Sequence, residues 1–506
     1  MIRFLASRPL RIFLIVWIGY SAHFATNIVR EHYPAFSIAE QGTFKVDRYQ
    51  GFHADIFVHR DGHSYVGNNV IVSVIAAIPL FVFDPVLDAL ERYSKRKLEE
   101  NSKIFDEYRT DKPNRVAFFN LVKEQGLDLR FGAATVVTSV FLMAPLTALM
   151  VVLMYGTLAR RNVTPGNALW LALLFAFGTP IFFRQAHLNH NMFLMYALFV
   201  AFLLLWRRPD RAYPVPLGYR LAAGFLGGFT LAVDYIGVLT LCGLYLLLFF
   251  DRLSTADWVR SFRESLAYVL ASIPPVLFLL YSQWAMYGNP FLPGQYWMPE
   301  QNIYVQEGWR GFDWPALDLF FKNLFDPAYG MYAFGPVLIL GLLPTWYYRE
   351  NEKILPRELR RFIALTVLAF LVFCAANQYS RLQWNTGFRY LVPLVPLVYL
   401  AACDHLVRMP RWLRVPVTIV AVLHSWVLTV FREPVPDSWQ MFFDEGLTFP
   451  WLRVLRMTRP SGSSMVSHPL LPWLVLGITL LLILGIWRLG ERASRTYSVE
   501  GRSGCN

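Results

Sequence analysis

The sequence contains few charged residues for its length. Only 16% of its 506 residues are Asp, Glu, Lys or Arg, while hydrophobic residues make up 55%. Soluble domains carry about 25% charged residues, and a soluble chain of this size needs a polar surface to cover several cores. The composition therefore excludes an ordinary soluble enzyme and an intrinsically disordered chain.

Cysteine is also scarce. Three of the four cysteines lie in apolar runs and the fourth near the C-terminus, at positions Cys242, Cys374, Cys403 and Cys505. This distribution indicates neither a disulfide framework nor a cysteine metal cluster. The sequence has no self-similarity with a period of 20–50 residues, so a repeat array is not indicated either.

Apolar runs of transmembrane length recur along the chain and predict an all-α polytopic membrane protein, since only helices and closed barrels cross a bilayer. We expect about twelve transmembrane helices in a single integral-membrane domain over 1–506. The predicted spans are 11–29, 131–155, 168–183, 192–206, 219–233, 236–250, 266–284, 332–347, 362–377, 389–403, 414–431 and 470–487.

The apolar run 70–83 is interpreted as a re-entrant or interfacial segment, because 14 residues are short for a span. With this choice both termini lie inside, and the short loops predicted to be cytoplasmic hold most of the Lys and Arg. The formal charge of +12 is thus explained by membrane topology rather than by nucleic acid. The resulting regions are a first outer loop over 30–130, a bundle over 131–487 and a cytoplasmic tail over 488–506.

Helix signals occur within the first outer loop. Residues 33–41 predict a short interfacial helix that ends at Gly42. Asp84 followed by Pro85 is typical of a helix start, so a surface helix is expected over 86–105. A second surface helix is expected over 111–125, where Gly126 follows as a stop signal.

Carboxylates in this loop are candidates for catalysis. Glu31 directly follows the first predicted span, and Asp47 and Asp55 lie further along the loop. Such residues at a membrane boundary are often only solvated. The functional alternative is a general base that takes a proton from an acceptor hydroxyl while a phosphate-linked group leaves.

His187 and His190 lie in a second predicted outer loop with the sequence HLNHN. Their spacing places both rings on one face if the segment is helical. They are interpreted as hydrogen-bonding residues at the mouth of a cavity, as contacts to a pyrophosphate or sugar, or as metal ligands.

Basic residues on the same predicted side are candidates for holding a lipid phosphate. Arg389 begins a predicted span, and Arg381 and Arg184 lie in outer segments. A guanidinium offers paired donors to phosphate oxygens, although an interfacial arginine can also simply extend to the membrane surface. Asp234, between two short apolar runs, is either a hairpin cap or a residue of the substrate cavity.

The order of these features resembles the C-class (GT-C) membrane glycosyltransferases, a superfamily that includes protein O-mannosyltransferases and aminoarabinose transferases. The strings that resemble a bacterial branch of it are EQGTFKVD (40–47), DGHSYVGNN (61–69), FGTPIFFRQAHLNHN (177–191), YGNPF (287–291), LFDPAYGMYAFGPVLIL (324–340) and QWNTGFRYLVPLVPL (383–397). The resemblance implies a cytoplasmic N-terminus, one span, and a large outer loop with a catalytic acid right after that span. Glu31 stands in that position, where the family usually has aspartate, and Asp47 and Asp55 remain alternatives.

The resemblance implies a glycosyltransferase of the inner (plasma) membrane. Its donor would be a sugar linked to polyprenyl phosphate, its acceptor a glycan, lipid or protein hydroxyl, and its active site extracytoplasmic. No cofactor is expected; a divalent metal is not indicated, since the chain has no DxD motif. The alternatives are a multi-span transporter or a lipid or glycan flippase without catalysis, and a polysaccharide polymerase or ligase.

Overall fold

The structure is a computed structural model, and it describes residues 6–100, 113–161, 163–206, 215–253, 258–381, 389–458 and 466–503. Helices dominate these residues, and the only two strands among them are three residues long. The fold class is therefore that of an all-α polytopic membrane protein, as the sequence predicts. Six helices in the described ranges are long and apolar enough to cross a membrane, and five shorter apolar helices accompany them.

The chain divides into two compact units, and each is assembled from separate stretches of sequence. Unit 1 comprises Met1–Ile28, Val82–Leu188 and His405–Asn506, and unit 2 comprises Val29–Phe81 and Asn189–Asp404. The boundary near residue 81 falls inside helix α4 (Ile71–Glu99). The predicted limits 30–130, 131–487 and 488–506 concern membrane topology and remain predictions.

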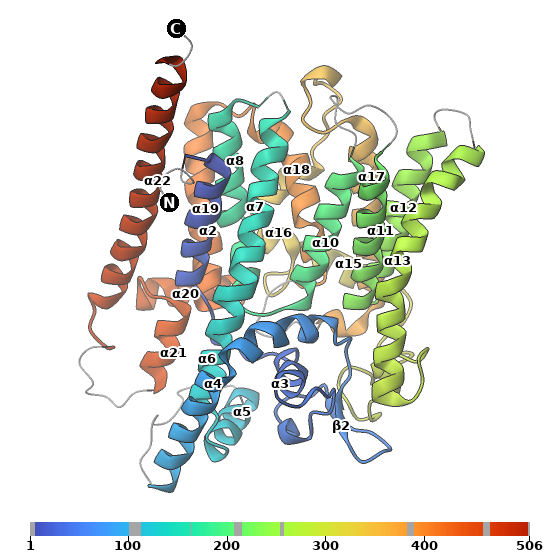
Figure 1. Cartoon of the computed structure of the whole chain (residues 1–506), viewed down its shortest axis with the longest axis vertical. Coiled ribbons are helices and arrows are strands. Elements are labelled where there is room, and N and C mark those ends of the chain that lie inside the picture. Colours follow the sequence, from blue (N-terminus) through green and yellow to red (C-terminus); the bar gives the residue numbers. More distant parts are fainter. Residues whose placement is uncertain are drawn as a thin grey trace. The chain divides into compact units, whose positions relative to one another are not determined.

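Unit 1 is a helical bundle (Figure 1). Its elements are α2 (Arg8–Ala22), α5 (Pro113–Glu124), α6 (Asp128–Thr138), the π-helical turn η2 (Ser139–Met143), α7 (Ala144–Ala159), α8 (Pro165–Phe177), α9 (Ile181–Gln185), α19 (Arg411–Phe431), α20 (Val435–Glu445), α21 (Pro450–Thr458) and α22 (Leu471–Ser503). Helix α2 packs against α7 and α22, while α19 packs against α8, α9 and α20.

Helices α8 and α19 run parallel. The Trp170 indole donates a hydrogen bond to the Thr418 hydroxyl (2.9 Å). About two turns further along α19, the hydroxyl of Ser425 donates to the Thr179 carbonyl (2.8 Å). The contacts advance along both helices in the same direction. The segment after α8 and the C-terminal end of α19 therefore meet within unit 1.

Unit 2 combines the remaining helices with a small hairpin. Its elements are α3 (His32–Gln41), η1 (Asp47–Tyr49), β1 (Ile56–Val58), β2 (Ser64–Val66), α10 (His190–Leu205), α11 (Leu217–Val233), α12 (Gly237–Leu253), α13 (Trp258–Tyr287), α14 (Gly294–Trp297), α15 (Leu317–Phe325), α16 (Met331–Phe334), η3 (Pro336–Leu342), η4 (Glu350–Glu352), α17 (Arg357–Ala376), η5 (Gln378–Arg381), η6 (Val392–Leu394) and α18 (Val395–Leu406).

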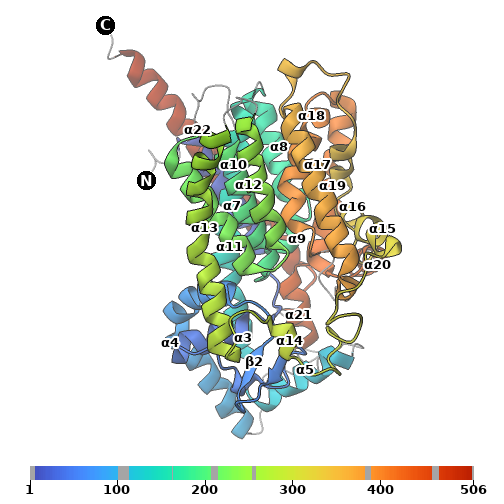
Figure 2. The same cartoon turned by 90° about the vertical axis from the view of Figure 1, so that its right-hand side faces the viewer.

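Helix α11 packs against α10, α12 and α13, and the four helices lie side by side in both views (Figures 1 and 2). Glycines permit its close approach to α13. A Cβ on Gly224 would lie 2.1 Å from the Tyr268 carbonyl oxygen, and one on Gly228 would lie 2.3 Å from that of Ser272. Small residues four apart let membrane helices pack backbone to backbone.

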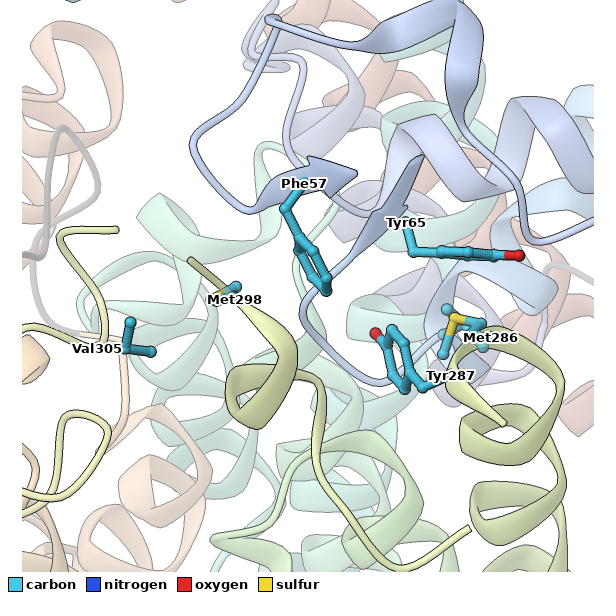
Figure 3. Packing of buried hydrophobic residues seen from close by; sticks show 7 residues of the cluster. Phe57, Tyr65, Met286, Tyr287, Met298 and Val305 are labelled. Atoms are coloured by element: carbon cyan, nitrogen blue, oxygen red, sulfur yellow. The ribbon is translucent and has the colours of Figure 1, made fainter. Parts of the chain in front are cut away.

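The two-stranded antiparallel hairpin pairs Ile56 with Val66 and Phe57 with Tyr65. Phe57 and Tyr65 belong to a buried cluster with residues from α13 and the loop after it, as Figure 3 shows; the other members are Val70, Met286, Tyr287, Met298 and Val305. The Tyr287 hydroxyl also donates a hydrogen bond to the Val66 carbonyl (2.6 Å). This apolar contact fixes the hairpin against α13.

The predicted helices of the first outer loop are partly confirmed. Helix α3 ends at Gly42, whose φ of 65° is left-handed, and α5 is followed by Gly126 with a φ of 63°. The prediction of a new helix at Asp84–Pro85 is wrong, because α4 continues through both residues. Residues 101–112, which the two predicted surface helices include in part, lie outside the described residues.

The continuity of α4 has a long-range cause. Buried Arg130 of α6 pairs with Asp84 at 3.3 Å, Asp88 at 2.5 Å and Glu91 at 3.2 Å. These three carboxylates lie along one face of α4, so Arg130 connects the turns on both sides of Pro85. Helix α4 is also one of the six helices long and apolar enough to span. The interpretation of 70–83 as a non-spanning segment remains a prediction.

Three predicted spans differ from the observed helices. The span predicted over 168–183 is interrupted, because α8 ends at Phe177 and the short α9 begins at Ile181. Helix α2 ends at Ala22, well before the predicted end at residue 29. The expected single helix over 332–347 is wrong, because Gly335 and Pro336 separate short α16 from the 3₁₀-helical η3. At the C-terminus, α22 continues through the predicted tail as far as Ser503.

Candidate active site

The segment that precedes α3 carries the first two residues of the site. Glu31 stands at the N-cap position of α3 and its side chain is only 3% exposed. Residues 23–30 lie between α2 and Glu31, so the carboxylate follows a connecting segment rather than the helix directly. Arg30 precedes it, and its Nε lies 3.4 Å from Glu31 Oε1.

His190 connects Glu31 to a second carboxylate. It is the first residue of α10, and its Nδ1 lies 2.5 Å from Glu31 Oε1. Its Nε2 lies 3.2 Å from Oδ2 of Asp234, which caps the C-terminus of α11. A protonated imidazole donates a hydrogen bond from each ring nitrogen, so His190 in that state satisfies both carboxylates at once.

A tight connection between α11 and α12 holds Asp234 in place. Its Oδ1 accepts a hydrogen bond from the Ile236 backbone N–H (3.3 Å), and its carbonyl accepts one from Gly237 (2.8 Å). A Cβ on Gly237 would lie 2.0 Å from the Thr230 carbonyl oxygen. The Gly237 position therefore needs glycine for this turn, which aims Asp234 at His190.

Arg30 joins Asp55 to the same group. Its Nη1 donates a hydrogen bond to Asp55 Oδ2 (2.5 Å). Asp55 precedes β1, is 1% exposed, and accepts a Gly67 backbone hydrogen bond at its carbonyl (3.0 Å). The Asn302 amide donates to the neighbouring Ala54 carbonyl (2.6 Å). The packed hairpin thus brings Asp55 to Arg30 and, through it, to Glu31.

Glu31, Asp55 and Asp234 are held in the ionised form. Burial alone would raise the pKa of Glu31, but the hydrogen bond from His190 and the charges of His190 and Arg30 outweigh it and lower that pKa. Burial is likewise outweighed by Arg30 and His53 at Asp55, and by His190 and Arg30 at Asp234, so the pKa of each is lowered. An ionised carboxylate in this cluster is a proton acceptor at neutral pH.

Arg389 contributes a second positive charge to the group. It precedes η6, and its Nη2 donates a hydrogen bond to the Tyr390 hydroxyl (3.0 Å). Its charge acts on Asp55 and on His53, and the charges of Arg30 and Glu31 act on it. Two guanidinium groups, on Arg30 and Arg389, therefore share one electrostatic environment with the carboxylates.

Asp47 is not part of this group. Its side chain is 51% exposed, where it contacts His63 Nδ1 at 2.8 Å and accepts a hydrogen bond from the Ser64 backbone N–H. Burial alone would raise the pKa of Asp47, but the hydrogen bonds from Ser64 and His63 and the charges of His63 and Lys45 together outweigh it and lower that pKa. The structure thus separates Asp47, which anchors the start of β2, from buried Glu31 and Asp55.

The prediction that His187 and His190 lie on one face of a helix is wrong. Helix α10 begins at His190 and its N-cap Asn189 is extended, so His187 lies in the non-helical segment before it. His187 and Arg184, a residue of α9, belong to unit 1, whereas His190 belongs to unit 2. The Nδ1 of His187 accepts a hydrogen bond from Arg432 Nη2 (2.8 Å).

Arg381 is the last residue of η5, and its side chain is outside the described residues. Its predicted contact with a phosphate stays a prediction. Among the described residues, no three His, Cys, Asp or Glu side chains are grouped to hold a metal ion. This observation does not test the expectation that the protein needs no cofactor.

Sequence reasoning missed Arg30, Tyr304 and Tyr390. Arg30 lies beside Glu31 in the sequence, and this adjacency could have indicated that it belongs to the site. Tyr304 lies in the loop after α14, and burial together with the Asp55 charge raises its pKa. Packing of Val305 against the hairpin and the Asn302–Ala54 hydrogen bond bring this loop to Asp55, so no local pattern indicated it.

No family model matches the chain, and no curated protein matches it. Two solved structures are similar to it, both of ArnT from Cupriavidus metallidurans. The crystal structure bound to undecaprenyl phosphate is 13% identical and has a TM-score of 0.49, with 96% of this chain and 76% of that chain covered. The apo structure is 13% identical over the same shares, with a TM-score of 0.45. At this identity the similarity assigns no role to any site residue.

Proposed function

We propose that this protein is a membrane glycosyltransferase that moves a sugar from a polyprenyl-phosphate donor to an acceptor hydroxyl on the extracytoplasmic face. The observation that carries the proposal is the buried contact of Glu31 with His190, in a cluster that also holds Arg30, Asp55 and Asp234. It combines a proton acceptor with positive charge, which are the two groups that this reaction requires.

Glu31 is the proposed general base. As the acceptor oxygen bonds to the anomeric carbon, its proton passes to the Glu31 carboxylate. The bond from that carbon to the phosphate oxygen breaks, and the lipid phosphate leaves with the electron pair. Because this is one direct displacement, the anomeric configuration inverts. Asp55 remains an alternative base, although Arg30 already occupies one of its oxygens at 2.5 Å.

Arg389 and Arg30 are the proposed partners of the leaving phosphate. Negative charge develops on that phosphate as the bond breaks, and fixed guanidinium donors stabilise it. Both arginines act electrostatically on Asp55, and Arg389 also interacts with Glu31, so a phosphate that binds them would lie close to the proposed base. The strings that resemble GT-C enzymes support the same donor class.

A transporter or flippase without catalysis is the competing function. A transport site also contains buried charges at membrane depth. It does not require an ionised carboxylate fixed by a histidine beside two arginines, whereas a base and a phosphate partner explain this set directly. The acceptor, the sugar and the membrane side are parts of the proposal.

The test uses purified full-length protein with a panel of polyprenyl-phosphate sugars and lipid, glycan or peptide acceptors. We expect release of polyprenyl phosphate that depends on acceptor, and a product with the inverted anomeric configuration by NMR. Lipid movement in proteoliposomes without any release of polyprenyl phosphate would instead indicate the flippase.

A further inference from the structure

Asp234 is the carboxylate of the cluster to which the proposed mechanism assigns no step. Its Oδ2 lies 3.2 Å from Nε2 of His190, whereas Glu31 contacts Nδ1 of the same ring at 2.5 Å. The turn between α11 and α12 fixes this carboxylate, because the Ile236 backbone N–H donates a hydrogen bond to its other oxygen. Asp234 therefore faces the proposed base across the imidazole.

A second side chain faces the same ring nitrogen. Nη2 of Arg30 lies 3.4 Å from His190 Nε2. A guanidinium has only donors, so this contact is a hydrogen bond when Nε2 carries no proton, whereas the contact with ionised Asp234 is one when Nε2 does. Nδ1 faces a Glu31 oxygen in both cases and donates to it. Two forms of His190 are thus available: an imidazolium bonded to both carboxylates, or a neutral ring bonded to Glu31 and Arg30.

The contacts of the two competitors favour the imidazolium. Nη1 of Arg30 donates to Asp55, and its Nε lies 3.4 Å from Glu31, so two other carboxylates already offset its charge. A neutral His190 would instead turn the lone pair of Nε2 toward the Asp234 oxygen at 3.2 Å. Two acceptors that face each other in a largely buried place, where the Asp234 side chain is 23% exposed, are costly.

We propose that Asp234 is a positioning residue that keeps His190 protonated, and that the resulting imidazolium holds Glu31 as an oriented carboxylate. In this role Asp234 contacts no reacting atom. The proton of the acceptor hydroxyl passes to Glu31, and both ring protons stay on His190. The consequence for catalysis rests on the function proposed above, whereas the protonation of His190 does not.

The charge of Asp234 is what this role requires. A charge-assisted hydrogen bond is about twice as strong as a neutral one, so an imidazolium holds Glu31 more firmly than a neutral ring does. The other ionisable groups on which the Asp234 charge acts are uncharged at neutral pH; they are Tyr235, Cys374 and Tyr390. Asp234→Asn keeps an oxygen for the Ile236 N–H and removes the charge, so it isolates this effect.

Solid-state ¹⁵N NMR of histidine-labelled, full-length protein in lipid measures the protonation of His190 directly. Signals that disappear in His190→Gln assign the residue. At pH 7 both ring nitrogens should be protonated in the parent, and only Nδ1 in Asp234→Asn. Asp47→Asn is the matched control, because it removes the carboxylate that contacts His63 at 2.8 Å and should leave the His190 signals unchanged. A neutral His190 in the parent, or an imidazolium that persists in Asp234→Asn, overturns the proposal.

The pH dependence of sugar transfer separates a positioning role from a contact with substrate. Asp234→Asn should move the acid limb of the profile to higher pH, as His190→Gln does, and leave the KM for the donor parental. In the His190→Gln background Asp234→Asn should cause no further shift, because two residues that act through one contact are not additive. A further shift in the double variant, or a change confined to the KM, overturns the positioning role. A parent without any sugar transfer would refute the proposed function, and the NMR measurement would still decide the state of His190.

Discussion

The Nδ1 of His190 lies 2.5 Å from the Oε1 of Glu31, and this contact joins the start of α10 to the start of α3 across 159 positions of sequence. It is one of the contacts that lower the pKa of a carboxylate that burial alone would raise. The chemistry proposed for Glu31 therefore depends on His190, and replacing the histidine should change the pKa of the carboxylate.

His190→Gln should raise the pKa of Glu31, because the hydrogen bond and charge of His190 no longer help Arg30 to oppose the effect of burial. The acid limb of the pH–activity profile should move to higher pH, with a lower maximal rate. His63→Gln is the matched control, since His63 contacts exposed Asp47 in the same way at 2.8 Å. A profile of His190→Gln that keeps the parental acid limb would show that His190 does not govern the ionisation of the base.

The stability of the fold should depend on pH through the three carboxylates of the cluster. The pKa values of Glu31, Asp55 and Asp234 are lowered in the fold. Such groups contribute their stability above the unfolded carboxyl pKa of about 4–4.5, and lose it as the pH falls through the lower folded value. The melting temperature in detergent should thus be level near neutral pH and fall below about pH 4.5.

Asp55→Asn should reduce that acid dependence, because one of the three carboxylates no longer titrates. Asp318→Asn provides the comparison, since Asp318 is an exposed carboxylate that pairs with Lys322 at 3.3 Å. The slope of melting temperature against pH should shrink for Asp55→Asn and stay parental for Asp318→Asn. The same slope in both variants would mean that other groups cause the acid sensitivity.

Both the charge and the planar shape of the Arg389 guanidinium should contribute to binding of the lipid phosphate. Arg389→Lys retains the charge but loses the planar fork, and Arg389→Ala loses both. Direct binding of polyprenyl phosphate to purified protein should weaken in the order parent, Lys, Ala, with a loss of about 10- to 150-fold for Ala. Unchanged binding with a lower melting temperature would make Arg389 a structural residue.

The membrane side of the site is testable by cysteine labelling. Gln50 lies in the predicted outer loop and Asn351 in a predicted inner loop, and both are exposed. In a cysteine-free background, Gln50→Cys should react with an impermeant maleimide in intact cells, while Asn351→Cys should react only after permeabilisation. The reverse pattern would place the proposed site in the cytoplasm.

The sequence indicated which residues to examine, but not which of them meet. Glu31 and Asp47 are both acids of one loop, and only burial distinguishes them: 3% of Glu31 is exposed, against half of the Asp47 side chain. Burial depends on the packing of the hairpin against α13 and on α10, which no local pattern contains. The contact of Glu31 with His190 is likewise long-range.

Two errors in the predicted elements could have been avoided from the sequence, and a third could not. Asn189 is a favourable N-cap residue, so the start of α10 at His190, which separates it from His187, was readable from the sequence. The Gly335–Pro336 break within 332–347 was also visible, but the apolar run outweighed it. The continuity of α4 through Pro85 was not readable, because Arg130 stabilises it from a distant segment.

The central claim is that Glu31 accepts the acceptor's proton during sugar transfer. The most direct measurement is the single-turnover rate of sugar transfer from a labelled polyprenyl-phosphate donor, with the parent, Glu31→Gln and Asp47→Asn compared at equal folded protein. Glutamine keeps the shape of Glu31 and removes its basicity, so the account predicts a rate about 10²- to 10⁴-fold lower for Glu31→Gln and an unchanged rate for Asp47→Asn. A parental rate in Glu31→Gln would contradict it.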